Sequence, residues 1–359
     1  MASVPGLRVV LLVSGSVLLT LLLGFGLPVL LNAGMWLLGI PETSVTECIV
    51  GLYLMFVVSV AMPRIPRGCI KVEGKAVLIT GCDRGFGLGL AKHLHKLGFT
   101  VFAGCLLKDE GGEGAKELEE MRSERMKVLQ MDVCSEEQTE RAVESIRLNL
   151  GDTVLWAVVN NAGVASFGEV EFTSIDTYRQ VYEVNLIGTI RITKAVLPLI
   201  RRAKGRVVNI ASLYGRMGNI MRSSYCVSKY GVEAFSDCLR YEMKTWGVKV
   251  SVIEPGNFIQ ATGVLTRDIV TNTSLKLWAE APPCVQEDYG KVHFEQQMAL
   301  MRSFCSSGQK DMAPVLNDIT DAVTSKWPYT RYSPAEPHWW IRAQFMTHLP
   351  SAVSDLLYF

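Results

Sequence analysis

A tyrosine and a lysine four residues apart, Tyr225 and Lys229, are the side chains whose types and spacing most directly suggest catalysis. At positions i and i+4 they share one face of a helix. A phenol with its ordinary pKa of about 10 is a poor base at neutral pH, and a nearby cation favours the phenolate. The pair therefore predicts that Tyr225 exchanges a proton with a substrate hydroxyl or carbonyl group.

Two more polar residues fit the same chemistry. Ser212 follows a strand-like run at 206–210, where its hydroxyl can polarise the substrate oxygen that takes part in the proton transfer. Asn185 can hold a water molecule that relays protons. Because a tyrosine and a lysine at this spacing also occur on ordinary helix faces, the prediction depends on all four residues together.

Arg222, three residues before Tyr225, is a candidate substrate-binding residue, as is Ser212. Its guanidinium can pair with a substrate carboxylate. The alternative is an arginine in a solvated loop, and Arg216 offers a similar but weaker case.

A glycine-rich turn lies between a strand-like run at 76–80 and a helical pattern at 86–97. Glycines in this position let the backbone approach a pyrophosphate, which the helix N-terminus stabilises. The spacing G-x3-G-x-G is weak on its own, and a structural turn without a ligand is the alternative. The turn residues that we assign to a cofactor site are Gly81, Asp83, Arg84, Gly85, Phe86 and Gly87.

Three later strand ends add to the predicted cofactor site, because open α/β sheets bind ligands at the carboxyl ends of their strands. The residues are Cys105, then Asp132 with Val133, and then Asn161, Ala162 and Gly163. An acidic residue at the end of the second strand would hold a ribose 2′-hydroxyl, but Cys105 stands there instead. NAD and NADP therefore both stay open, with Arg84 and Lys108 as possible phosphate contacts or solvated surface.

The elements that position these residues alternate between short β-branched runs and helical patterns. Strand-like runs stand at 76–80, 100–106, 127–131, 155–159, 206–210 and 249–253. This alternation predicts an α/β fold, a Rossmann-type doubly wound parallel sheet with helices on both faces.

Charge divides the chain into two unlike parts. All 359 residues together hold 36 Lys and Arg against 35 Asp and Glu, and a net charge of +1 offers no basic field for nucleic acid. Residues 1–62, however, contain only Arg8, Glu42 and Glu47 as charged residues, and the uncharged stretch 9–31 exceeds the roughly 20 residues that cross a bilayer. We expect a membrane anchor of one or two apolar helices at 1–62, followed by a basic linker at 63–75.

The rest of the chain is expected to form a core at 76–260 and an extension at 261–359 that covers the substrate and associates with lipid. Prolines and aromatic residues mark the extension. The nine cysteines are scattered without zinc spacing or a disulfide pattern, so we predict no metal site and a reducing compartment.

These motifs resemble those of the short-chain dehydrogenase/reductases over about 75–256. The matching residues are 80–87, 160–163, Asn185, Ser212, Tyr225, Lys229, Pro255 and Gly256. The sequence Thr-Gly-Cys-Asp at 80–83 is similar to the branch that holds retinol, type 2 11β-hydroxysteroid and D-β-hydroxybutyrate dehydrogenases. Longer strings such as 167–174, 198–206 and 235–243 resemble the hydroxybutyrate enzymes most.

The resemblance implies NAD as cofactor, bound by Tyr225, Lys229, Pro255 and Gly256 among others. It also implies a small-molecule substrate, (R)-3-hydroxybutyrate or acetoacetate, a membrane lipid such as phosphatidylcholine, a homo-oligomer and the mitochondrial inner membrane. Two departures keep alternatives open: the apolar N-terminus is like that of endoplasmic-reticulum retinol and steroid enzymes, and Arg84 replaces the usual serine. A retinoid or steroid substrate is the second hypothesis, and a membrane scaffold with a retained dinucleotide fold is the third.

Overall fold

The computed structural model describes residues 67–358 and, before them, residues 22–39 together with 15, 18, 19, 51, 53 and 55. The chain divides into two compact units, 1–67 and 68–359. Most of the predicted anchor, 1–62, lies outside the described residues and stays a prediction. Its described part includes a π-helix, η1 (Leu22–Gly26), and α2 (Leu27–Leu37). In the portion of the chain that the structure describes, no helix is both long and apolar enough to cross a membrane.

A seven-stranded parallel sheet in the order β3-β2-β1-β4-β5-β6-β7 forms the centre of the second unit. The strands are β1 (Lys75–Thr80), β2 (Thr100–Cys105), β3 (Met126–Gln130), β4 (Val154–Asn160), β5 (Arg206–Ile210), β6 (Lys249–Ile253) and β7 (Arg331–Tyr332). Most positions of β1, β2 and β4 are buried, as expected for parallel strands covered on both faces. The predicted parallel α/β sheet is therefore confirmed.

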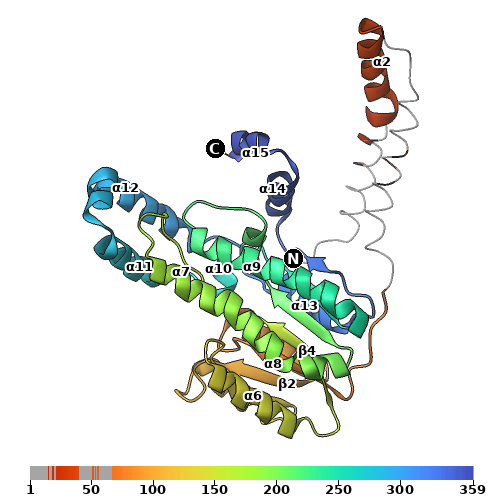
Figure 1. The fold of residues 1–359 in the computed structure, drawn as a ribbon, viewed down its shortest axis with the longest axis vertical. Coiled ribbons are helices and arrows are strands. Elements are labelled where there is room, and N and C mark those ends of the chain that lie inside the picture. The colour runs from red at the N-terminus through yellow and green to blue at the C-terminus, as the bar shows by residue number, and fades with distance from the viewer. Residues whose placement is uncertain are drawn as a thin grey trace. The chain divides into compact units, whose positions relative to one another are not determined.

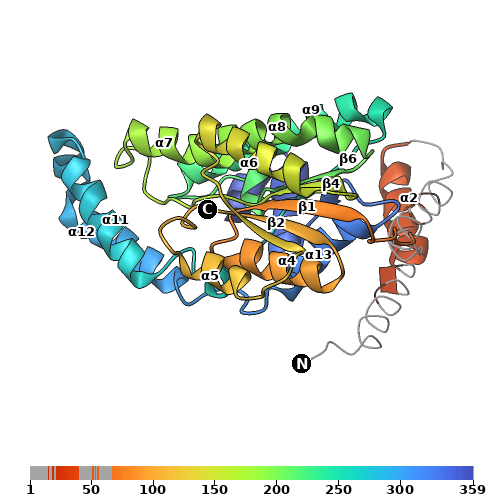
Figure 2. The ribbon, with the colours of Figure 1, turned by 90° about the horizontal axis from the view of Figure 1, so that it is seen from below.

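Helices cover both faces of this sheet, as Figure 2 shows. On one face α4 (Gly85–Lys96), α5 (Glu113–Glu119) and α13 (Ala313–Thr324) bury side chains such as Leu90, Leu118 and Ile319. On the other face α6 (Glu136–Asn149), α8 (Thr189–Arg202) and α9 (Ser223–Met243) bury Ile146, Val196 and others. These two apolar layers hold the strand ends in fixed positions.

The C-terminal part of the chain completes the sheet. Strand β7 pairs with β6, although the sequence places the end of the core at residue 260. The segment just before β1 also pairs with this part, because the Ile70 N–H donates to the Thr324 carbonyl at 2.8 Å. Residues 68–75, expected as linker, therefore belong to the second unit.

Three groups of helices surround the carboxyl ends of the strands (Figure 1). The first is α7 (Ile175–Tyr182) with the π-helix η3 (Glu183–Gly188), which runs into α8. The second is α10 (Ile259–Thr262), α11 (Arg267–Glu280) and α12 (Pro283–Phe304), of which the last two pack on Phe167 and Phe172. The third is α14 (Pro337–His348) with α15 (Ser351–Tyr358).

Candidate active site

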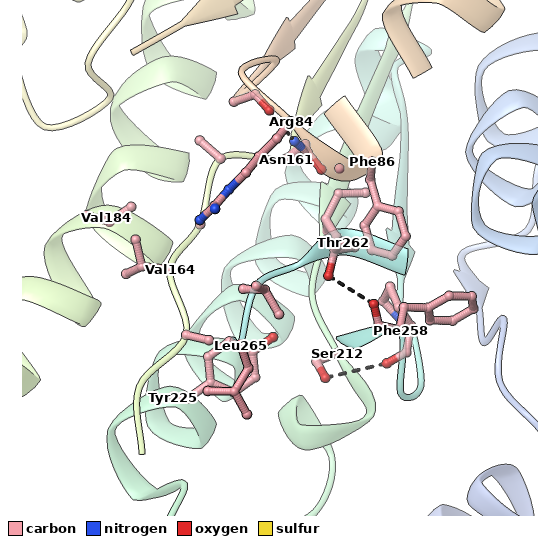
Figure 3. A pocket seen from close by; sticks show the side chains of 18 of the residues that line it. Arg84, Phe86, Asn161, Val164, Val184, Ser212, Tyr225, Phe258, Thr262 and Leu265 are labelled. Carbon is pink, nitrogen blue, oxygen red and sulfur yellow. Dashed lines mark hydrogen bonds between the residues drawn. The ribbon is translucent and has the colours of Figure 1, made fainter. Parts of the chain in front are cut away.

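A cavity of about 1190 Å³ lies at the carboxyl ends of the strands, where open α/β sheets bind ligands. It is lined by most of the residues that the sequence assigns to a site. These are Gly81, Asp83, Arg84, Gly85, Phe86, Asp132, Val133, Asn161, Ala162, Gly163, Ser212, Arg222, Tyr225, Lys229, Pro255 and Gly256. Three assigned residues, Gly87, Cys105 and Asn185, do not line it. In Figure 3, Arg84 and Asn161 lie at one end of the cavity and Ser212 and Tyr225 at the other.

The turn between β1 and α4 has the shape that a pyrophosphate needs. Gly81 has φ +70°, and a Cβ there would lie 2.8 Å from the Ala162 Cα. A Cβ at Gly87 would lie 2.1 Å from the Gly81 carbonyl oxygen, so the turn needs a glycine there although Gly87 does not line the cavity. Helix α4 begins at Gly85 with no side chain capping its first N–H groups. Such an open helix N-terminus beside a glycine turn fits the diphosphate of a dinucleotide.

Polar side chains hold this turn in place. The Asn161 Nδ2 donates to the carbonyl oxygens of Thr80 and Gly81, at 2.9 and 3.1 Å. Both Asp83 carboxylate oxygens accept hydrogen bonds, from the backbone N–H groups of Leu106 and Leu107, at 2.9 Å each. Asn161 and Asp83 therefore position the backbone around the predicted cofactor site.

The assignment of Cys105 to the cofactor site needs a correction. Its side chain is fully buried in the core between the sheet and α4, and the cavity is lined instead by the next two residues, Leu106 and Leu107. Burial raises the pKa of its thiol to about 12. Alternate residues of a strand point to opposite faces, and sequence alone does not show which face meets a ligand.

Tyr225 and Ser212 meet at the other end of the cavity. Tyr225 lies on the first turn of α9, and Ser212 stands directly before the 3-10 helix η4 (Leu213–Gly215). Burial raises the pKa of Tyr225 to about 12, whereas a hydrogen bond with Ser212 and the charge of Arg222 act to lower it. Desolvation thus outweighs the favourable contacts in the structure, and the prediction that a neighbouring cation favours the phenolate stays a prediction. A protonated phenol is suited to donating its proton to a carbonyl oxygen.

Lys229 lies one turn after Tyr225 and is 5 % exposed. Its Nζ donates to the Ile210 carbonyl oxygen at 2.8 Å and lies 5.7 Å from the centre of the Tyr225 ring. Burial lowers the pKa of this ammonium to about 8, and the charge of Glu233 acts in the opposite direction. Lys229 is thus placed between the proposed proton donor and the end of strand β5.

Asn185 lies in η3, where a π-helical turn interrupts the passage from α7 to α8. Its Oδ1 accepts from the Val164 N–H at 2.8 Å, and its Nδ2 donates to the Val164 carbonyl and to the Ser228 hydroxyl at 3.0 Å each. These contacts make Asn185 a support for the loop after β4. Any role in a water relay stays a prediction.

Arg222 is not the solvated loop residue of the alternative interpretation. It stands directly before α9 and is 8 % exposed. Its Nη1 donates to the Ser166 carbonyl at 3.1 Å, and burial lowers its pKa. Arg216, by contrast, does not line the cavity and pairs with Glu254 at 3.4 Å.

A strand-turn-helix dinucleotide site beside a serine, a tyrosine and a lysine agrees with the comparison to known families, because the family model for short chain dehydrogenases matches residues 75–267. The chain belongs to the short-chain dehydrogenase family. D-beta-hydroxybutyrate dehydrogenase, mitochondrial, from Bos taurus is 57% identical over 290 residues, 80% of this chain and 84% of that protein. Estradiol 17-beta-dehydrogenase 2 from Mus musculus is 41% identical over 298 residues, 80% of this chain and 77% of that protein.

A solved short-chain dehydrogenase from Streptomyces avermitilis has the same fold, with a TM-score of 0.62. It is 23% identical, and the match covers 80% of this chain and 96% of that one. The family match and the identity to the bovine enzyme make the chain an oxidoreductase, and most of the family's motif residues line the cavity described above.

The cavity of this short-chain dehydrogenase also contains residues that the sequence did not single out. Glu113 lines it from the start of α5, and Tyr214 and Asn219 line it beside Ser212. Trp339 of α14 lines it as well and packs edge-on against Tyr214, with 6.2 Å between ring centres. Four apolar lining residues, named here the apolar lid, come from the loop between α10 and α11 and from α12: Val264, Leu265, Met301 and Phe304. Turn position could have suggested Tyr214. Trp339 belongs to the aromatic extension that the sequence predicts to cover the substrate, and its place in the cavity agrees with that prediction.

Proposed function

We propose that this protein interconverts (R)-3-hydroxybutyrate and acetoacetate with NAD(H). The observation that carries the proposal is the buried Arg222 beside Tyr225 in the cavity. No acidic side chain among the described residues 67–358 forms an ion pair with it within 4.0 Å. A buried cation is costly unless it is paired, so this guanidinium favours a substrate with a carboxylate.

Residue roles follow from the geometry. In ketone reduction Tyr225 donates its phenolic proton to the carbonyl oxygen, while the Ser212 hydroxyl hydrogen-bonds the same oxygen. Lys229 supplies a positive charge next to the phenol and, by resemblance, contacts the cofactor ribose. Arg222 holds the substrate carboxylate, which fixes the carbonyl in reach of Tyr225. The nicotinamide cofactor, when bound, supplies or accepts the hydride.

The surroundings of β2 favour NAD over NADP. Lys108, a possible contact for a 2′-phosphate, lies 4.0 Å from Glu119 as an ion pair. Glu113 lines the cavity together with Leu106 and Leu107, which follow β2, and its carboxylate would repel the 2′-phosphate of NADP there. Arg84 is exposed at the cavity and is the remaining cation of the turn.

A hydroxysteroid or retinoid substrate is the second candidate, and the apolar lid formed by Val264, Leu265, Met301 and Phe304 favours it. Such a substrate leaves Arg222 without an anionic partner. The lower identity of the chain to the estradiol enzyme, 41% against 57%, also favours the hydroxybutyrate reaction. A scaffold without activity is disfavoured because Ser212, Tyr225 and Lys229 are all in place.

We further propose that the protein is a membrane-anchored homo-oligomer of the mitochondrial inner membrane, with the endoplasmic reticulum as the alternative location. Residues 1–62 serve as the anchor. Helices α14 and α15 contact lipid such as phosphatidylcholine, since they expose Trp340, Phe345, Leu356 and Leu357. The name of the bovine relative supports the mitochondrial location.

A substrate panel tests the proposed reaction. The full chain in phosphatidylcholine vesicles is assayed with hydroxybutyrate, retinol and a corticosteroid, each with NAD and with NADP. We expect turnover of hydroxybutyrate with NAD, and Tyr225→Phe abolishes it while the cofactor still binds. Turnover of retinol or the steroid alone, or unchanged turnover by Tyr225→Phe, contradicts the proposal.

A further inference from the structure

A cluster of buried charged residues lies next to Lys229 along α9, outside the cavity. Glu233 is one helical turn after Lys229 and is 6 % exposed. Glu254, the residue before Pro255, is 1 % exposed. Carboxylates are rarely this buried unless they are paired, so their partners indicate what the cluster does.

One arginine from the last strand joins the cluster. Arg331 Nη1 donates to the carboxylates of Glu233 and Glu254, the latter at 3.1 Å, and its Nη2 donates to Asp237 at 2.6 Å. Glu254 also accepts from Arg216 at 3.4 Å and from the Ser333 hydroxyl at 2.8 Å. The cluster therefore ties α9 to the ends of β6 and β7.

Glu233 is under-satisfied within this cluster. Its Oε2 binds Arg331, but its Oε1 is buried and has no hydrogen-bond partner among the described residues. The positive charge of Lys229 is likewise buried with little compensation. Its ammonium group is desolvated, and a backbone carbonyl accepts a hydrogen bond from it. A buried cation and a buried carboxylate one turn apart on a helix stabilise each other's charged forms.

We propose that Glu233 is a positioning residue for the reaction, a carboxylate fixed by Arg331 whose negative charge keeps Lys229 in its ammonium form. The inference rests on the role proposed above for Lys229. The charged and titratable groups that face Glu233 are Lys229 and Asp237 on its own helix, Arg331 on β7, Glu254 at the end of β6 and Arg216 after η4.

The approach of the serine loop to this carboxylate agrees with the proposal. A Cβ on Gly215 would lie 3.0 Å from both the Glu233 Cγ and the Lys229 carbonyl oxygen. Gly215 thus lets the loop that carries Ser212 pack directly on the Lys229–Glu233 turn. Burial and the neighbouring Glu254 raise the pKa of Glu233, while Arg331 and Arg216 oppose this rise. The charge of Glu233 therefore depends on Arg331 being in place.

The test is the pH dependence of acetoacetate reduction by the full chain with NADH. In the native protein we expect kcat/KM to fall as Lys229 loses its proton, near its pKa of about 8. Glu233→Gln keeps the shape but removes the charge, and we expect the midpoint of this fall to move about one pH unit lower. Glu233→Asp retains the charge and keeps the native midpoint.

Asp237→Asn is the matched control, because Asp237 also binds Arg331 but lies two turns from Lys229 and is shared with Arg240. We expect it to keep the native midpoint. A native midpoint in Glu233→Gln, whatever the loss of rate, assigns Glu233 a structural role only and overturns the proposal.

A substrate-independent measurement separates this inference from the proposed function. The affinity for NADH is followed by fluorescence across the same pH range, since Lys229 is expected to contact the cofactor. Suppose that neither the native protein nor any variant reduces acetoacetate. If the loss of NADH affinity with rising pH then has its midpoint at a lower pH in Glu233→Gln than in the native protein, the substrate assignment is wrong and the role of Glu233 stands. If NADH affinity shows the same pH dependence in both proteins, the role of Glu233 is wrong.

Discussion

The Cα of Gly87 packs so closely on the carbonyl oxygen of Gly81 that a Cβ at Gly87 would lie 2.1 Å from that oxygen. This contact brings the start of α4 against the end of β1. Gly85 and Phe86 at the start of this helix line the cavity, and no side chain caps the first N–H groups, so these can bind a phosphate there. Gly81 lines the cavity and Gly87 does not, but the contact between them determines the shape of the cofactor site.

Gly87→Ala tests this contact. The added methyl group must push the turn away from α4, so we expect the Kd for NADH to rise at least about tenfold, equivalent to roughly 1.4 kcal/mol. Gly89→Ala, in the same helix, is the control, because its Cβ would lie 3.5 Å from the Leu316 Cδ1 in ordinary contact. Fluorescence titration measures both affinities, and native affinity in Gly87→Ala would contradict the expectation.

Arg222→Leu removes the proposed partner of the substrate carboxylate. We expect the KM for acetoacetate to rise about a hundredfold, since a charge-assisted hydrogen bond to a buried group contributes roughly 2–3 kcal/mol. The KM for an uncharged methyl ketone changes little. Arg216→Leu is the control, since Arg216 pairs with Glu254 and does not line the cavity. An equal effect of Arg222→Leu on both substrates rules out the carboxylate contact.

Much of the fold could be predicted from local sequence. The strand-like runs 206–210 and 249–253 coincide with β5 and β6, because fully buried parallel strands are continuous runs rich in β-branched residues. Strand β7 could not be found in this way, since it is two residues long and one of them is Arg331. It is held by tertiary interactions, namely its pairing with β6 and the ion pairs of that arginine with Glu233, Asp237 and Glu254.

The site was predictable where the spacing of residues determines its geometry. Tyr225 and Lys229 share a helix face because of their i, i+4 spacing, and both line the cavity. The pKa of Tyr225 could not be predicted in direction, because a sequence shows the nearby charges but not the desolvation that outweighs them. Likewise Trp339 reaches Tyr214 from 125 residues further along the chain.

Trp339→Ala tests whether α14 is part of the substrate site. Loss of the indole opens the cavity and removes the edge-on contact to Tyr214, which accepts a hydrogen bond from Asn219 at 3.0 Å. We expect kcat/KM for hydroxybutyrate to fall about tenfold, or roughly 1.4 kcal/mol. Trp340→Ala is the matched control, since Trp340 is exposed and does not line the cavity. Equal kinetic effects of the two substitutions in steady-state assays would place the role of α14 outside the cavity.

The depressed pKa of Lys229 predicts how stability depends on pH. Its pKa is about 8 in the folded protein against 10.5 for the ordinary side chain, so between these values the unfolded chain binds more protons than the folded one. Stability contributed by this group therefore rises with pH across that window, by about 3 kcal/mol in total. Below pH 8 both states carry the proton, and the folded protein bears the full cost of the buried charge.

Lys229→Met removes this dependence. We expect the native protein to gain about 3 kcal/mol in free energy of unfolding relative to Lys229→Met between pH 8 and pH 10.5. Urea denaturation at both pH values measures the difference, and the effect of Tyr225 ionisation largely cancels because both proteins keep that residue. Lys244→Met, which removes an exposed lysine, shows no such change. A constant difference between native protein and Lys229→Met would mean that Lys229 has an ordinary pKa in the folded state.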